Sequence, residues 1–308
     1  MKIIDCILKS YSSTINWPKL LSKLKITSIW RRTLVAFGMF FFPKAFSRIK
    51  TTLIKERTPA IIVSLTSYPA RIDKVWLTIE SIFLQQLKPD RIVLWLSKEQ
   101  FTRLEDLPQE LIAQQKRGLE IRFVDNDYKS HKKYLYAFKE FPNDYIVLID
   151  DDIIYPSTMI ANLYEGISPQ NVHCSYGSVI QWSDNGEPRP YRDWKSTTDK
   201  YYGDDFFFGS GGGTMLMPAS LPKETCDIDL ALELCPKADD IWLNAMCRRA
   251  GLTISKVRSA LIYPTNIDSK DTLYRENIGL GKNDLQLKNV NNHFSNVFRQ
   301  QSKLDITE

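Results

Sequence analysis

The stretch Tyr145-Ile146-Val147-Leu148-Ile149-Asp150-Asp151-Asp152 places an apolar run directly before three adjacent carboxylates. A short run of this kind predicts a buried strand. Three neighbouring carboxylates at its end repel one another unless a cation neutralises them. In an extended chain residues i and i+2 point the same way, so we expect Asp150 and Asp152 to share a metal ion while Asp151 faces elsewhere. Oxygen ligands favour Mn²⁺ or Mg²⁺; a solvated acidic turn is the alternative interpretation.

Similar apolar runs precede this strand, with helical patterns between them. The expected strands are residues 60–65, 91–96 and 119–124, and the expected helices are residues 73–83, 108–117 and 131–140. Asp73 is placed to cap the first of these helices. The alternation predicts an α/β fold, Rossmann-like, with a mostly parallel central sheet and helices on both faces. Ligands of such sheets bind beyond the carboxyl ends of the strands.

A second acidic pair, Asp239-Asp240, stands before the apolar segment 241–246, which is typical of a helix start. Capping and the helix dipole favour aspartate there without any further role. Trp242 is either a platform for stacking a sugar or a core residue. The segment 206–213 holds three phenylalanines and a glycine-rich run, and glycine lets backbone approach a ligand closely.

Five segments taken together carry a family resemblance: residues 64–71, 127–133, 150–156, 208–218 and 238–242. In this order they resemble a bacterial family 2-type nucleotide-sugar glycosyltransferase with the glycosyltransferase A fold. The resemblance implies a metal-dependent, inverting transfer of a sugar from a nucleoside diphosphate donor, with a UDP-sugar expected. The implied acceptor is a hydroxyl of a saccharide or a lipid-linked acceptor in bacterial surface polysaccharide synthesis.

The resemblance also implies roles for single residues. The metal on Asp150 and Asp152 would neutralise the departing diphosphate, and Asp151 would bind the ribose or assist the metal. The nucleotide and its diphosphate would be held by four further residues: Thr66, Tyr68, which could stack on the base, Arg71 and Lys133. The sequence departs from the family pattern at Lys129-Ser130-His131, where a small turn containing glycine is expected.

For the acceptor side, the resemblance implies a general base in the second acidic pair. We expect Asp240 to take the acceptor proton, with Asp239 as the second candidate or as an orienter of the acceptor. The third metal ligand is left open, with His293 as one candidate.

The first 57 residues carry eight Lys and four Arg against Asp5 and Glu56, although the whole chain of 308 residues has a formal net charge of only +5. The apolar run 34–42 ends at Pro43 and is too short to span a bilayer. Basic flanks around a phenylalanine-rich run favour a helix in the lipid interface; a helical arm packed on the main domain is the alternative. Nucleic acid is not expected as a partner, because no recognition motif accompanies the charge.

These observations divide the chain into a basic helical N-terminal arm (1–57), a catalytic domain (58–265) and a C-terminal tail packing on it (266–308). Five scattered cysteines, without a C-x-x-C pair, favour a reduced compartment. We therefore expect a cytoplasmic protein, peripheral on the anionic inner face of the cell membrane. Two rival hypotheses are a nucleotidyltransferase that makes sugar nucleotides, and a catalytically silent glycan- or membrane-binding module.

Overall fold

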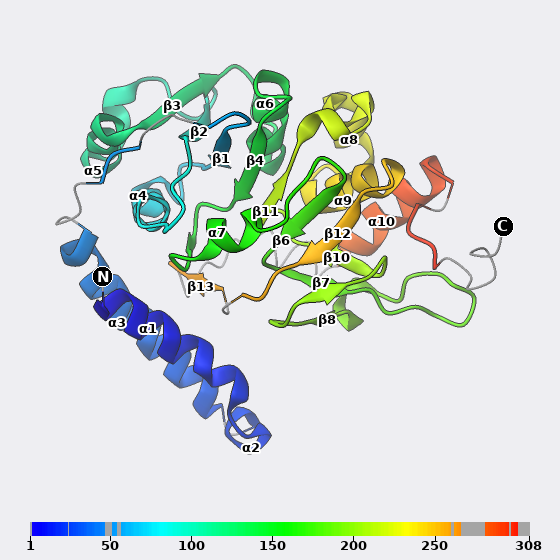
Figure 1. The fold of residues 1–308 in the computed structure, drawn as a ribbon, viewed down its shortest axis with the longest axis horizontal. Coiled ribbons are helices and arrows are strands. Elements are labelled where there is room, and N and C mark those ends of the chain that lie inside the picture. Colours follow the sequence, from blue (N-terminus) through cyan, green and yellow to red (C-terminus); the bar gives the residue numbers. More distant parts are fainter. Residues whose placement is uncertain are drawn as a thin grey trace.

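The computed structural model describes residues 2–23, 25–46, 51–53, 57–259, 262–265, 281–295 and 297–300. An eight-stranded sheet with the order β3-β2-β1-β4-β11-β6-β12-β9 forms its centre (Figure 1). The strands are β1 (Ile61–Thr66), β2 (Arg91–Ser97), β3 (Leu119–Val124), β4 (Tyr145–Ile149), β6 (Asn171–Cys174), β9 (Tyr201–Tyr202), β11 (Gly212–Leu216) and β12 (Thr253–Lys256). The first four confirm the strands predicted from the sequence.

The sheet is mostly parallel, as predicted. The strands β3, β2, β1 and β4 pair in parallel, β11 is antiparallel to β4 and β6, β12 is parallel to β6, and β9 is antiparallel to β12. Two short sheets lie beside it. They are formed by β7 (Gly177–Val179), β8 (Lys195–Ser196) and β10 (Phe206–Phe208), and by β5 (Ile153–Ile154) and β13 (Tyr263–Pro264).

Alternating side chains of the strands build two cores on opposite faces of the sheet. Ile61, Val63 and Leu65 of β1 pack with α4 (Ile72–Phe83), α5 (Gln109–Gln114) and α7 (Met159–Tyr164). Ile62 faces the other core, which contains α6 (Lys132–Glu140), α8 (Ile228–Leu234), α9 (Asp239–Arg249) and α10 (Lys282–His293). The α/β fold class, with helices on both faces, is therefore confirmed.

The strand order reverses direction at β1: β2 and β3 extend the sheet on one side of it, and β4 lies on the other. In a sheet of this type the connections at such a switch point diverge and leave a crevice at the carboxyl ends of the strands. The loop after β1 and the loop after β4 both begin there. These loops contain Thr66 to Arg71 and the aspartate triplet, so the topology brings the first two predicted segments together.

One local prediction is wrong. Helix α4 begins at Ile72 with Arg71 at its N-cap position and no side-chain capping bond, so Asp73 lies inside the first turn, where the helix dipole still favours it. Helix α3 (Ile26–Phe46) continues through Pro43, beyond the apolar run 34–42. Phe42 and Phe46, on either side of the proline, are buried in a core with the main domain, and this packing holds the last turn.

The N-terminal residues form a helical hairpin of α1 (Lys2–Ser13) and α3, with the short α2 (Lys19–Lys23) at its far end (Figure 1). The hairpin shares a core with Leu77 and Ile154 of the main domain. Tyr263 of β13 donates its hydroxyl to the Leu34 carbonyl at 2.6 Å. A Cβ at Gly38 would overlap this hydroxyl, so the glycine allows the close approach. Among the described helices, none has the length and apolar character needed to cross a bilayer.

The predicted tail falls partly outside the described residues, because 266–280, 296 and 301–308 are not among them. Its described helix α10 packs on the main domain through Leu287 and Val290, which belong to the same core as Trp242. The domain boundaries themselves remain a prediction.

Candidate active site

The loops after β1 and β4 contact each other directly. Ser67 Oγ donates to Asp151 Oδ2 at 2.6 Å, and Arg71 Nη1 donates to Asp151 Oδ1 at 2.9 Å. Arg71 also lies 3.0 Å from Asp152 Oδ2. The Asp151 side chain is only 6% exposed. Both carboxylate oxygens of Asp151 thus accept hydrogen bonds from the loop after β1, and Asp151 joins the two loops. A contact of Asp151 with ribose or metal stays a prediction.

The carboxylates of the other two aspartates of the triplet are more exposed than that of Asp151. The side chains of Asp150 and Asp152 are 43% and 27% exposed, which agrees with the expected alternation around buried Asp151. Side-chain cations offset part of the expected repulsion between these carboxylates. Lys133 lies 2.8 Å from Asp150 and Arg71 lies 3.0 Å from Asp152. Each cation is shared with a second carboxylate, Lys133 with Asp239 and Arg71 with Asp151, so negative charge remains in excess.

Two partly exposed carboxylates at the switch point still fit a divalent ion by the chemistry of their donor atoms. Oxygen ligands suit Mg²⁺ and Mn²⁺, which commonly complete their coordination with phosphate oxygens and water. Within the described residues, three or more His, Cys, Asp or Glu side chains do not gather into a metal-binding group. Among the described residues a metal at Asp150 and Asp152 would have two carboxylate ligands, and phosphate oxygens of a substrate and water are the usual further ligands of such ions.

Lys133 connects the two acidic sites that are far apart in the sequence. Its Nζ lies 2.8 Å from Asp150 Oδ1 and 3.1 Å from Asp239 Oδ2, and its side chain is 4% exposed. Burial opposes its charge, but Asp150, Asp239 and Asp240 raise the pKa of Lys133 above its ordinary value. The lysine is therefore neither a solvated helix residue nor a cation without a partner; it is charged and held between two carboxylates.

The sheet fixes the position of Lys133 through its backbone. Ser64 of β1 donates its hydroxyl to the Lys133 carbonyl, and Trp95 Nε1 of β2 donates to Ser64 Oγ at 2.9 Å. Ser64 is fully buried between the apolar residues Val63 and Leu65 of β1. Its hydroxyl thus ties the first turn of α6 to the carboxyl end of β1.

The glycine-rich run after β10 contacts both acidic sites. Ser210 Oγ donates to Asp239 Oδ2 at 2.7 Å, and the Asp150 N–H donates to the Gly211 carbonyl at 3.0 Å. Tyr155 donates its hydroxyl to the same carbonyl. A Cβ at Gly211 would overlap the Asp150 carboxylate. Glycine at 211 is therefore required by the close approach of Asp150.

The second acidic pair lies inside the first turn of α9, which begins at Asp239. Burial alone would raise the pKa of Asp239, but Lys133, His131 and the Ser210 hydroxyl lower it to about 2. Burial, with the neighbouring charge of Asp239, raises the pKa of Asp240 to about 7. Two adjacent carboxyls with opposite shifts are typical of a division between a permanently charged group and a group that exchanges a proton.

The departure from the family pattern at Lys129-Ser130-His131 has a clear structural outcome. Lys129 adopts a left-handed backbone with φ of 53°, the conformation that glycine would take without strain. The Asp127 carboxylate supports this turn by accepting from the Lys129 N–H at 3.3 Å and by pairing with Lys132. His131 is fully buried, and its Nε2 lies 2.8 Å from the Cys235 carbonyl. The turn thus has a left-handed residue at Lys129, as a glycine would allow, while the side chains of Lys132 and His131 bind Asp127 and the Cys235 carbonyl.

The residues at the end of β1 that are predicted to contact the nucleotide already make contacts within the protein. Thr66 donates its hydroxyl to the Trp95 carbonyl at 2.8 Å, at the end of the sheet. The Arg71 guanidinium lies 5.4 Å from the centre of the Tyr68 ring. Arg71 thus contacts Asp151, Tyr68 lies beside Arg71, and Thr66 binds the neighbouring strand β2. Their binding of a nucleotide remains a prediction.

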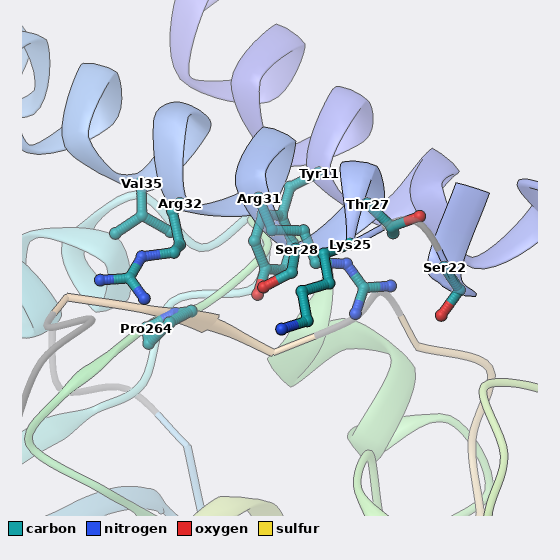
Figure 2. Close-up of a pocket in the computed structure, with 9 residues that line it drawn as sticks. All are labelled: Tyr11, Ser22, Lys25, Thr27, Ser28, Arg31, Arg32, Val35 and Pro264. Carbon is teal, nitrogen blue, oxygen red and sulfur yellow. The ribbon is translucent and has the colours of Figure 1, made fainter.

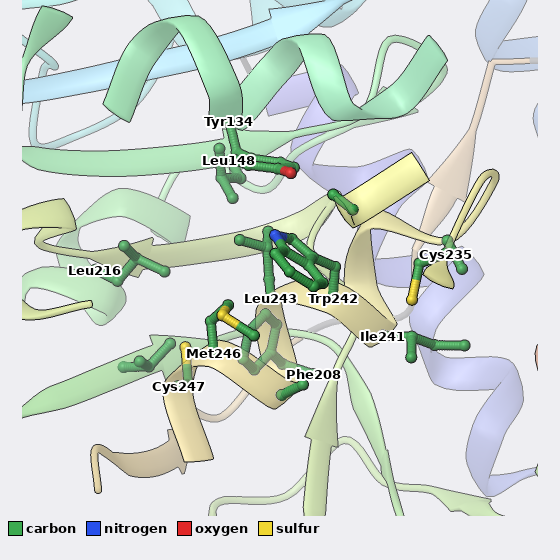
Figure 3. Packing of buried hydrophobic residues seen from close by; sticks show 14 of the residues in the cluster. Tyr134, Leu148, Phe208, Leu216, Cys235, Ile241, Trp242, Leu243, Met246 and Cys247 are labelled. Atoms are coloured by element: carbon green, nitrogen blue, oxygen red, sulfur yellow. The ribbon is translucent and has the colours of Figure 1, made fainter. Parts of the chain in front are cut away.

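Trp242 and the phenylalanines of β10 are core residues. Trp242 is fully buried, and its Nε1 donates to the Thr225 carbonyl at 3.0 Å (Figure 3). This burial excludes Trp242 as a platform for a sugar.

Phe206, Phe207 and Phe208 are at most 1% exposed, so these rings belong to the core and do not face a ligand. His293 packs its ring edge-on against Phe294 at the end of α10.

Sequence reasoning missed several residues that hold the site together, namely Ser64, Ser67, His131 and Ser210. Each is small or neutral, and its position in the sequence has no distinctive spacing. The only available signal was their place in the segments beside the predicted strands or within the glycine-rich run, because the hydrogen bonds join residues up to 104 positions apart.

Comparisons with known proteins give a likeness of fold at low identity. No family model and no curated protein matches the sequence. Among solved structures, GalNAc-T7 crystallised with UDP, GalNAc and Mn²⁺ aligns with a TM-score of 0.44 and 12% identity, over 68% of this chain and 43% of that one. The inositol-1-phosphate CTP transferase from T. maritima aligns with a TM-score of 0.44 and 9% identity, over 78% and 98%. Likeness at this level assigns no activity or ligand to this chain.

Proposed function

We propose that the chain is a metal-dependent, inverting glycosyltransferase of the glycosyltransferase A type. It transfers a sugar from a nucleoside diphosphate donor, expected to be a UDP-sugar, to a hydroxyl of a saccharide or lipid-linked acceptor in bacterial surface polysaccharide synthesis. One observation carries the proposal. A single buried lysine joins the aspartate triplet at the switch point to the acidic pair of α9, so that both predicted halves of the site lie together.

The two halves suit the two charges that develop in such a transfer. The acceptor oxygen forms a bond to the anomeric carbon while the bond from that carbon to the diphosphate oxygen breaks. The acceptor loses a proton, and the nucleoside diphosphate leaves with the bonding electrons. Asp240 is the base that takes the proton of the acceptor hydroxyl, since its pKa of about 7 lets it accept a proton near neutral pH.

Asp239 and Lys133 serve as positioning residues in this scheme. Asp239 keeps its charge and holds Lys133, and Lys133 in turn holds Asp150 on the side where the diphosphate would bind. A divalent ion on Asp150 and Asp152 would supply a Lewis acid for the departing diphosphate. Arg71, which lies 3.0 Å from Asp152, is a second side-chain cation beside the same site.

The N-terminal arm supports a membrane location for this activity. Five exposed apolar residues fall on one face of α3, away from the face that is buried on the domain: Ile26, Ile29, Trp30, Phe37 and Phe40. We call this set the apolar face of α3. Lys44 lies 5.1 Å from the centre of the Phe40 ring at its end. An exposed apolar face with basic residues around it fits the interface of an anionic membrane.

The function is tested by incubating the full chain with Mn²⁺, a panel of UDP-sugars and saccharide or lipid-linked acceptors, and identifying the products by phosphorus NMR and mass spectrometry. Transfer predicts release of UDP together with a heavier acceptor. Release of pyrophosphate from a nucleoside triphosphate and a sugar phosphate would instead identify a nucleotidyltransferase and refute the proposal. Asp229→Asn, at an exposed aspartate in the first turn of α8, is the matched control for Asp240→Asn.

A further inference from the structure

A group of buried polar side chains on and just after α4 has no part in the proposed mechanism. Thr78, Ser81 and Gln85 follow one another at intervals of three and four residues, which places them on one side of the helix. Each is at most 2% exposed, in a helix whose apolar residues belong to the core. Burying a polar side chain is unfavourable unless it is hydrogen-bonded, so the partners of these three residues indicate their role.

The three side chains all bind one segment, residues 151–160. Their partners are backbone groups: the Asp151 carbonyl, the Tyr155 N–H, the Pro156 carbonyl and the Ile160 N–H. Thr78 binds the aspartate triplet itself, because its Oγ1 donates to the Asp151 carbonyl at 2.9 Å. The side of α4 that carries Thr78 therefore holds the chain from the triplet to the start of α7.

A second element binds the next carbonyl of the triplet. The Thr265 N–H donates to the Asp152 carbonyl at 2.7 Å, directly after β13 pairs Pro264 with Ile153. The carbonyls of Asp151 and Asp152 belong to the two peptide units on either side of the Asp152 Cα. A residue has only two soft backbone torsions, so two fixed peptide units fix the direction in which the Asp152 side chain leaves the backbone. We call the hydrogen bonds to these two carbonyls the backbone clamp.

Both halves of the backbone clamp adjoin the helical hairpin. Leu77 precedes Thr78, and Tyr263 lies two residues before Thr265. Leu77 and Tyr263 are both buried in the core that the hairpin shares with the main domain. The hairpin therefore packs on the residues that position the two donors of the clamp.

The contact of the hairpin with β13 includes one polar bond. The Tyr263 hydroxyl donates to the Leu34 carbonyl at 2.6 Å, and the centre of its ring lies 5.6 Å from that of Phe42. At the same junction Val35 and Pro264 line a cavity of about 320 Å³ (Figure 2). Removing the hydroxyl thus weakens the junction while the ring of Tyr263 can keep its apolar contacts.

We propose that Thr78 is a positioning residue of the aspartate triplet, and that the docked hairpin, through Leu77 and Tyr263, keeps the backbone clamp in place. The hairpin is then a part of the candidate metal site as well as the proposed contact with the membrane. The metal side of this inference rests on the proposed function, whereas the clamp is formed without a bound ion.

Hydrogen exchange of the full chain, without metal or donor, tests the backbone clamp. Thr78→Val removes the hydroxyl at nearly constant volume and leaves the Asp151 carbonyl without this partner. Exchange over residues 150–156, followed by mass spectrometry, should become about tenfold faster. Thr225→Val is the matched control, because Thr225 is also buried and its hydroxyl also donates to a backbone carbonyl, at 2.6 Å, beside Trp242. This control should leave exchange over residues 150–156 unchanged.

The Mn²⁺ affinity of the UDP complex, measured by electron paramagnetic resonance, tests what the clamp does for the site. Thr78→Val should lose at least about tenfold in affinity, and Thr78→Ser, which keeps the hydroxyl, should retain most of it. Tyr263→Phe should lose about threefold. Its control is Tyr201→Phe, which removes a hydroxyl bond to Asp205 from the edge strand β9 and should lose nothing.

The outcomes separate this inference from the proposed function. Equal exchange rates over residues 150–156 in Thr78→Val and Thr225→Val would overturn the clamp, and equal Mn²⁺ affinities in Tyr263→Phe and Tyr201→Phe would overturn the part of the hairpin. If the unmodified chain bound no Mn²⁺, the metal dependence of the proposed function would fail, whereas the exchange rates would still decide for or against the clamp.

Discussion

Lys133 Nζ lies 2.8 Å from Asp150 Oδ1 and 3.1 Å from Asp239 Oδ2, so one ammonium group joins two carboxylates that are 89 positions apart in the chain. The side chains of Lys133 and Asp239 are each 4% exposed, so this pair is largely removed from water, whereas Asp150 is 43% exposed. Breaking a buried ion pair on one side leaves the opposite charge without compensation, which is strongly destabilising. The lysine therefore matters for both the fold and the site.

Replacing Lys133 by Met should abolish transfer and lower the free energy of unfolding by about 3–5 kcal/mol. The loss arises because Asp150 and Asp239 would face each other without a cation. Chemical denaturation measures the change. Lys139→Met, at an exposed position of the same helix, is the control and should leave both stability and activity nearly unchanged. Comparable stability of the two variants would contradict the triad.

Asp240→Asn should abolish transfer while making the protein more stable at pH 8, by on the order of 1–2 kcal/mol. The folded-state pKa of Asp240, about 7, is above its ordinary value of 3.8. The folded state thus binds a proton more tightly than the unfolded state, and stability from this group is lost as pH rises through about 7. Removing the charge should recover it. A variant that is inactive and less stable than wild type at pH 8 would contradict this account.

The rate should increase with pH around neutrality. Asp239, Lys133, Asp150 and Cys235 are the charged or titratable groups near Asp240, and among the carboxyls Asp239 already has a pKa of about 2. A base must be deprotonated to act, so kcat/KM should rise through pH about 7 and level above it. A profile that is flat from pH 5 to pH 8, or one that falls, would exclude Asp240 as the base.

Gly211→Ala should weaken Mn²⁺ binding in the presence of UDP by at least about tenfold, because the added Cβ would displace the Asp150 carboxylate. Electron paramagnetic resonance of free Mn²⁺ measures the affinity. Gly251→Ala is the control: its φ of +66° makes alanine strained, but no atom lies within 4 Å of the new Cβ. Equal affinity in the two variants would show that Asp150 does not depend on this approach.

Phe37→Ser with Phe40→Ser should reduce binding of the full chain to anionic vesicles without a loss of stability, since both rings are exposed, by 45% and 64%. Leu285→Ser removes an apolar side chain of similar exposure, 60%, from α10 and should leave vesicle binding unchanged. Unchanged binding in the phenylalanine variant would rule out the apolar face of α3 as the lipid contact.

Three of the four predicted strands, β1, β2 and β4, could be read from sequence because their apolar runs are short, continuous and almost entirely buried, as Tyr145 to Ile149 illustrates. The site could be predicted only in part. Aspartates that follow a strand can be recognised in the sequence. Their pairing with Lys133 and Arg71 cannot, because it depends on distances in the folded chain. The same holds for Trp242, whose burial is decided by packing against other elements and not by its neighbours in sequence.

Local rules failed where tertiary contacts outweighed them. Helix α3 passes through Pro43 because Phe42 and Phe46 are buried beside it, and Lys129 takes a conformation suited to glycine because Asp127 holds its N–H. Neither compensation can be read from residues near in sequence alone.

The central claim is that Asp150 and Asp152 hold the metal and Asp240 takes the proton, in one site. The most direct measurement is a titration of Mn²⁺ into the UDP complex of three variants, followed by electron paramagnetic resonance, together with an assay of transfer. Asp150→Asn and Asp152→Asn should each lose at least about tenfold in Mn²⁺ affinity, and Asp240→Asn should bind Mn²⁺ normally while transferring no sugar. Unchanged Mn²⁺ affinity in both Asp150→Asn and Asp152→Asn, or full transfer by Asp240→Asn, would contradict it.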